Sequence, residues 1–212
     1  DLLNLCHKMV PTKKNGSERL EAMIMGIPNV GKSTLINNLA GRMIAKTGNE
    51  PAVTKNQQRI KLDQGIVLLD TPGVLWPKLE NKHGGYRLAI TGAIKETAVS
   101  NDDIAMYAVD YFRRAYPELL KQRYQLDELP EDELPLLEMI GAKRGCLRAG
   151  GRVDLDRAAK ILLTEFRDIT IGRITLETPE MMETELIEMV KIRAEKEAKQ
   201  AAKKKKRHGS RD

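Results

Sequence analysis

Short apolar runs separated by polar and glycine-containing segments dominate the first third of the chain. The run at 23–25 leads into a glycine-rich segment, and residues 34–40 follow it with the spacing of a helix. Two further runs, 59–62 and 66–69, are separated by Asp-Gln-Gly at 63–65, which is typical of a hairpin turn. This third of the chain therefore predicts a small unit of strands and helices.

Beyond residue 77 the apolar positions recur at helical spacing instead. This spacing predicts helices over 102–115, 117–124, 134–143 and 154–166, with a last helix that begins at Pro179. We expect the aliphatic and methionine side chains to form the core of a small helical bundle rather than a cofactor site. On the last helix these are Met182, Leu186, Met189 and Val190.

The glycine-rich segment reads Gly26-Ile-Pro-Asn-Val-Gly-Lys-Ser33, a complete P-loop between a predicted strand and a predicted helix. Successive backbone N–H groups and the helix N-terminus form an anion site. Lys32 would reach the β- and γ-phosphates, and the Ser33 hydroxyl would bind Mg²⁺. The expected nucleotide-binding residues are Asn29, Val30, Gly31, Lys32, Ser33, Thr34 and, from the next motif, Gly73.

A second motif, Asp70-Thr-Pro-Gly73, closes the apolar run 66–69. An aspartate in this position holds Mg²⁺, and the Gly73 N–H would meet the γ-phosphate. The polar segment 48–56 lies between the motifs, where a switch loop belongs, and Thr54 is its best ligand for Mg²⁺ and the γ-phosphate. An ordinary loop hydroxyl is the alternative for Thr54. The predicted catalytic set is Lys32, Thr54 and Asp70.

The residue after Gly73 is Val74, whose apolar side chain cannot orient a water molecule for attack. Either a group from elsewhere completes the site, or hydrolysis is slow until a partner binds. Asn29 offers a carbonyl oxygen near the phosphates as a K⁺ ligand, with a solvated loop amide as the alternative. For His83 a polar loop position is favoured over a catalytic role.

Composition narrows the class of protein further. The chain has 212 residues, with 36 Lys and Arg against 30 Asp and Glu, and the net charge is +6. No apolar run approaches the ~18 residues that a membrane span needs. Cys6 and Cys146 lack metal-ligand spacing and are interpreted as reduced thiols of a cytosolic protein.

The guanine-reading Asn-Lys-x-Asp motif does not follow the second motif. The nearest string, Asn81-Lys-His-Gly84, lacks the Asp and is interpreted as a loop. The P-loop, the extended motif Asp70-Thr-Pro-Gly-Val-Leu-Trp-Pro77 and the helical remainder resemble the circularly permuted ribosome-assembly GTPases of the YlqF/RbgA family, over roughly residues 20–190. In that family the guanine-specificity motifs precede the P-loop, so this chain is expected to lack that N-terminal part.

The resemblance implies an α/β P-loop GTPase, with a partial, circularly permuted G domain followed by an all-α C-terminal domain. Residues 1–20 would be the end of the preceding half and a linker, and 21–84 the phosphate-binding half. A helical RNA-binding domain over 85–192 and a disordered basic tail over 193–212 would follow.

Basic residues of the helical region are the candidate RNA contacts. They are Lys143, Arg144, Arg148 and Arg152 around a glycine-rich turn, with Arg167 and Arg173 on the same side, and Lys204 and Lys205 in the tail. Scarce aromatic residues, 4%, argue for contacts to phosphates and RNA shape rather than base stacking. A solubilising tail is the alternative reading of the last basic run.

The resemblance implies a GTPase in late assembly of the large ribosomal subunit. Its expected location is a cytoplasm of bacterial type, with a bacterially derived organelle as the alternative. It would bind GTP or GDP with Mg²⁺ and with K⁺ as an additional candidate, dock on rRNA in the GTP state and leave on hydrolysis. No membrane span and no DNA partner are expected. The alternatives are a non-hydrolysing RNA-binding fragment and an NTPase unrelated to ribosomes.

Overall fold

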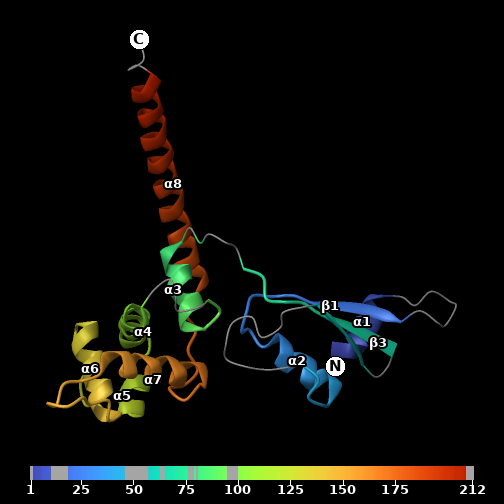
Figure 1. Cartoon of the computed structure of the whole chain (residues 1–212), viewed down its shortest axis with the longest axis horizontal. Coiled ribbons are helices and arrows are strands. Elements are labelled where there is room, and N and C mark those ends of the chain that lie inside the picture. Colours follow the sequence, from blue (N-terminus) through green and yellow to red (C-terminus); the bar gives the residue numbers. More distant parts are fainter. Residues whose placement is uncertain are drawn as a thin grey trace.

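The structure is a computed structural model that describes residues 2–10, 19–45, 57–62, 65–75, 79, 81–94 and 100–208, with side chains up to residue 199. It has two parts, shown in Figure 1. The sheet part comprises the described residues up to 75, and the helical part comprises those from 81 onward.

The sheet part contains three strands, β1 (Leu20–Ile24), β2 (Gln58–Lys61) and β3 (Ile66–Asp70), in the order β1-β3-β2. β1 and β3 are parallel, with Leu20 opposite Ile66 and Ile24 opposite Asp70. β2 and β3 are antiparallel, as the hairpin pattern predicts. The parallel register brings the residues that follow β1 and β3 to one edge of the sheet.

One face of this sheet carries α2 (Lys32–Ala40), and α1 (Leu2–Met9) also packs against the sheet part. Ile36 of α2 is fully buried, in a small core with side chains from all three strands. The strand β3 is buried at four of its five positions, which explains its continuous apolar sequence. This core fixes the start of α2 beside the carboxyl ends of β1 and β3.

The helical part has its own, larger core around Phe112. Its elements are α3 (Lys82–Ile90), α4 (Asn101–Ala115), α5 (Pro117–Tyr124), α6 (Glu133–Lys143), α7 (Leu155–Arg167) and α8 (Pro179–His208). Polar caps begin α4 and α7: Ser100 accepts from the Asp103 N–H, and Asp154 from the Arg157 N–H. The helices α4 to α7 begin and end within two residues of their predicted starts and stops, and α8 begins at Pro179 as predicted.

The helix α3 differs from the sequence prediction, which placed a loop at 81–84. Asn81 caps this helix by accepting the His83 N–H. Ala89 and Ile90 are buried in the helical core, and Arg87 is buried beside them. The two adjacent glycines at 84 and 85 hide the helix in the sequence. Since α3 spans 82–90, it crosses the expected boundary between 84 and 85 and belongs to the helical part.

The helix α8 differs from the prediction in two ways. It continues to His208 through the range where a disordered tail was expected from 193. Alanine, lysine and glutamate, which dominate this range, are good helix formers. In addition, Met182, Leu186 and Val190 are exposed rather than part of the core. The reason is that α8 extends beyond the helical bundle (Figure 1), so most of its length has no packing partner in the described chain.

Among the helices that the structure describes, none combines the length and apolar composition needed to cross a membrane.

Candidate nucleotide-binding site

The loop between β1 and α2 has the backbone conformation that a phosphate cradle requires. Asn29 and Gly31 both adopt positive φ, at 57° and 87°. Asparagine tolerates this left-handed region, and glycine enters it without steric cost. Gly31 is the residue before the first turn of α2, and its carbonyl accepts the Leu35 N–H at 2.8 Å. The N-terminal N–H groups of α2 therefore open onto the loop.

Lys32 folds back over this loop. Its Nζ donates to the carbonyl oxygens of Ile27 at 2.8 Å and Gly26 at 3.1 Å. Partial burial lowers the pKa of Lys32, and the nearby negative charge of Asp70 acts in the opposite direction. The ammonium group is therefore held within the loop, where it would meet phosphate oxygens.

Asp70 ends β3 and is 1% exposed. It lies opposite Ile24, the last residue of β1, so its carboxylate is placed beside the start of the P-loop. The next residue, Thr71, donates its hydroxyl to the Ile24 carbonyl at 2.6 Å. This hydrogen bond joins the second motif to the strand that carries the first.

The rest of the second motif lies directly on the P-loop. The Val74 N–H donates to the Gly26 carbonyl at 3.2 Å. A Cβ atom at Gly73 would lie 2.6 Å from the Pro28 nitrogen, which no side chain could avoid because the obstacle is backbone. Glycine is thus required at 73 by close packing. Val74 itself is 66% exposed.

The residues present fit a Mg²⁺ ion. A hydroxyl from Ser33 and a carboxylate from Asp70 are hard oxygen ligands of the kind that Mg²⁺ prefers, and the ion normally keeps several waters and contacts phosphates. Thr54, the third predicted ligand, lies outside the described residues. Within the described ranges, no group of three His, Cys, Asp or Glu side chains is placed to hold a metal ion.

Asn29, the predicted K⁺ ligand, makes a contact that the sequence does not indicate. Its Nδ2 donates to the carbonyl oxygen of Gly92 at 2.7 Å. Gly92 follows α3, so this bond connects the P-loop to the helical part. The side-chain amide of Asn29 is therefore oriented by a residue 63 positions away in the sequence.

The predicted RNA-contact residues divide by their surroundings. Lys143 and Arg152 are exposed. Arg148 has an exposed side chain but donates to Asp154 at 2.8 Å, within the hairpin that pairs Leu147 with Val153. Lys204 and Lys205 lie in the last turns of α8. The turn around 148–152 therefore presents cations to solvent.

Two other arginines of that set have intramolecular partners. Arg144 lies 2.7 Å from Glu165 and over the ring of Tyr124, at 5.3 Å from its centroid. Arg167 is half-buried and donates to the backbone carbonyls of Ala89 and Ile90. Both side chains are therefore oriented into the helical part.

His83, for which a polar loop position was favoured, lies in the first turn of α3. It is exposed, and its Nδ1 is 3.0 Å from the Tyr107 hydroxyl. Tyr107 in turn stacks on Tyr86. His83 thus belongs to a surface cluster of rings in the helical part.

Sequence reasoning missed the residues that join α3 to its neighbours, namely Arg87, Glu185 and Gly92. Arg87 is 5% exposed and donates to Glu185 of α8 at 3.0 Å. A single arginine beside the apolar run Leu-Ala-Ile was the available signal for a buried cation. Nothing local in the sequence marks Gly92 or its partner.

Together, the parallel strands, the loop with Lys32, the buried Asp70 and the second motif packed on the loop define a P-loop nucleotide-binding protein of the GTPase class. The family described as 50S ribosome-binding GTPase matches residues 21–140. The chain belongs to this family.

Named relatives extend the match along the chain. The ribosome biogenesis GTPase A of Priestia megaterium is 53% identical over 167 residues, which cover 79% of this chain and 58% of the relative. Its namesake from Thermotoga maritima is 32% identical over 174 residues, 82% of this chain and 62% of the relative. The chain therefore spans about three fifths of the length of these relatives.

Solved structures agree with this placement. The crystal structure of GNP-bound YlqF from T. maritima aligns with a TM-score of 0.54 and 26% identity, over 84% of this chain and 66% of that chain. A GDP-bound YlqF structure aligns with a TM-score of 0.52. These matches confirm the resemblance to the YlqF/RbgA family and the fold class inferred from the sequence.

Proposed function

We propose that this chain binds and hydrolyses GTP and acts in late assembly of the large ribosomal subunit in the cytoplasm. It docks on rRNA in the GTP-bound state and leaves on hydrolysis. The observation that carries the proposal is the packing of the second motif on the P-loop, through Thr71 on Ile24 and Val74 on Gly26. A γ-phosphate between these two loops would contact both, so its loss would change their packing.

Each side chain has a defined role in this proposal. Lys32 and the N-terminus of α2 would neutralise the phosphates, while Ser33 and Asp70 would hold Mg²⁺, with Thr54 as the third ligand. Mg²⁺ supplies positive charge to the phosphate oxygens. Asn29 is the candidate K⁺ ligand. Because Val74 cannot orient water, the docked subunit supplies or positions the missing group.

The RNA contact is proposed for the exposed cations at the turn 148–152, with Lys143 beside them and the basic end of α8 as a second contact. Arg148 and Arg152 flank two glycines with positive φ, so the turn is tight and brings its cations close together. Such a surface binds phosphates without reading the base sequence. Structured rRNA of the large subunit is the proposed ligand.

The proposed activity is tested by GTP hydrolysis in K⁺ buffer, with and without purified large ribosomal subunits and with ATP as the competing substrate. We expect subunits to raise kcat at least about 10-fold and to saturate, since groups supplied by a partner have large effects in GTPases. ATP should be turned over poorly. Equal rates for both nucleotides, or stimulation by any added polyanion, would contradict the assignment.

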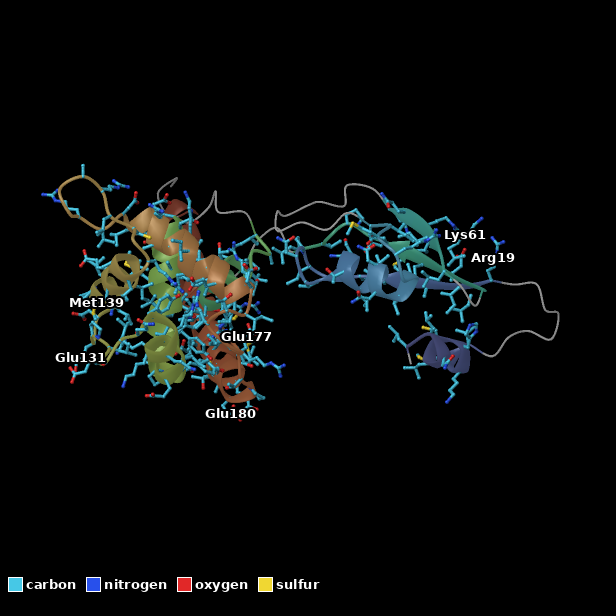
Figure 2. All side chains as sticks on the ribbon, turned by 90° about the horizontal axis from the view of Figure 1, so that it is seen from below. Arg19, Lys61, Glu131, Met139, Glu177 and Glu180 are labelled. Atoms are coloured by element: carbon cyan, nitrogen blue, oxygen red, sulfur yellow. The ribbon has the colours of Figure 1, made fainter. Side chains whose placement is uncertain are left out.

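The RNA contact is tested separately by the salt dependence of binding to a fragment of large-subunit rRNA. Arg152→Ala is expected to weaken binding and to reduce the slope of log affinity against log salt by about 0.7–0.9, the value for one phosphate contact. The matched control is Lys61→Ala, an exposed cation in β2 at the far end of the sheet part (Figure 2). Equal salt slopes for the two variants would show that the turn 148–152 does not contact RNA.

A further inference from the structure

The junction between the P-loop and the helical part is built around one glycine. Gly92 is buried, follows α3 and has a φ of 75°. Its carbonyl accepts the Nδ2 of Asn29 at 2.7 Å. A Cβ atom at Gly92 would lie 3.3 Å from the Arg167 guanidinium carbon and 3.6 Å from the Asn29 Nδ2. The Asn29 amide and the Arg167 guanidinium therefore both lie directly beside Gly92.

Arg167 holds the other side of this junction. It is the last residue of α7, and its Nε and Nη2 donate to the carbonyls of Ile90 at 2.8 Å and Ala89 at 2.9 Å. Carbonyls at the end of a helix lack partners within it, and a cation there is also favoured by the helix dipole. The planar guanidinium donates these bonds from two nitrogens held in a fixed geometry, which the single Nζ of a lysine could not reproduce. Arg167 thus fixes where α3 ends.

The position of α3's end determines where the Gly92 carbonyl points, because only Thr91 separates Gly92 from the carbonyl that Arg167 holds. With Nδ2 committed to that carbonyl, the plane of the Asn29 amide is set, and with it the direction of Oδ1. The P-loop residue is therefore oriented by a cation that belongs to the helical part. Three hydrogen bonds make up this path: two join α7 to the end of α3, and the third, from Asn29 to Gly92, crosses between the two parts.

We propose that Arg167 is a positioning residue for the nucleotide site, which acts through Gly92 to orient the Asn29 side chain in the P-loop. The inference deepens the proposed GTPase function and rests on it. It also provides a route by which RNA binding to the helical part would change the conformation of the P-loop. A shift of α7 against α3 would move the Gly92 carbonyl and release the Asn29 amide.

The first test compares Arg167→Ala with the wild-type full chain in steady-state GTP hydrolysis. We expect kcat to fall about 10-fold with the KM for GTP nearly unchanged, because misplacement of a site residue affects the transition state more than binding. Arg167→Lys keeps the charge but not the paired bonds and should recover only part of the rate. The control Arg157→Ala removes an exposed cation from the same helix and should leave kcat unchanged.

A double-mutant cycle decides whether Arg167 acts through Asn29. If it does, adding Arg167→Ala to Asn29→Ala should lower kcat no further than Asn29→Ala alone. Independent, multiplying effects would overturn the proposal. Gly92→Ala disturbs the same junction while Asn29 and Arg167 both stay in place. The added Cβ would press on the Arg167 guanidinium, and the φ of Gly92 is unfavourable for alanine.

The side-chain amide of Asn29, observed by ¹⁵N NMR and assigned with Asn29→Ala, gives a readout that does not depend on turnover. Arg167→Ala should speed its exchange with water about 10-fold, whereas Arg157→Ala should not. An unchanged amide in Arg167→Ala overturns the inference. Absence of GTP turnover in the wild type overturns the proposed function instead, and the amide exchange then still decides whether Arg167 orients Asn29.

Discussion

Replacing Lys32 with alanine is expected to lower kcat for GTP by about 10²–10³-fold, the usual effect of removing one preorganised charge at a reacting oxygen. The Nζ of Lys32 is already held inside the loop by the carbonyls of Gly26 and Ile27. Its lowered pKa, caused by partial burial, indicates that it has lost part of its hydration before any phosphate arrives. The interaction with a phosphate therefore needs little reorganisation.

The measurement is subunit-stimulated GTP hydrolysis, with fluorescent-nucleotide binding as the second readout. The control is Lys61→Ala, which removes a lysine from the end of the sheet opposite Asp70, where Lys61 pairs with Val67. Alanine is a strong helix former, so α2 should remain folded in the Lys32 variant. Hydrolysis by Lys32→Ala at the wild-type rate would show that another cation neutralises the phosphates and that the assignment of this loop is wrong.

The phosphate-binding half could be predicted from the sequence because its determinants are local. The P-loop needs its glycines and lysine at fixed spacing, and the apolar run 66–69 had to be a buried strand that ends at Asp70. The parallel pairing of the two strands then brings both motifs to one sheet edge, with Ile24 opposite Asp70. Periodicity likewise predicted the helices from α4 to α7, since each has a face that is buried in the helical core.

The contacts between the two parts could not be predicted, because they depend on how distant elements meet. Gly92 meets Asn29 across 63 positions, and Arg87 meets Glu185 across 98. The two glycines in α3 masked its helical pattern. The exposed apolar stripe of α8 was predicted to be part of the core. Periodicity shows that a helix has an apolar face, but it does not show whether another part of the chain covers that face.

Glu185→Ala is expected to destabilise the protein by about 3 kcal/mol, because it leaves a buried arginine without its main partner. Arg87 is 5% exposed, and the Glu185 side chain is 12% exposed. Both guanidinium Nη atoms donate to the two carboxylate oxygens of Glu185, and Asn81 donates to the same carboxylate at 2.6 Å. The loss would be at the low end for a broken buried pair, since the more exposed Glu177 also faces Arg87, at 3.4 Å.

Urea denaturation measures this loss, and Glu188→Ala is the matched control because it removes an exposed glutamate from the same helix.

The pH dependence of stability provides a second test of the same ion pair. Burial by itself raises the pKa of Glu185, but hydrogen bonds from Arg87 and Asn81 outweigh it and lower that pKa. A carboxylate with a lowered folded-state pKa stabilises the protein above its unfolded value of about 4.3, and this contribution disappears as the pH falls through the folded pKa. The difference in unfolding free energy between wild type and Glu185→Gln should therefore shrink as the pH falls below about 4.3. If Glu185→Ala proves no less stable than Glu188→Ala, the buried ion pair does not hold α8 against α3, and the attachment of the long basic helix must come from its apolar contacts alone.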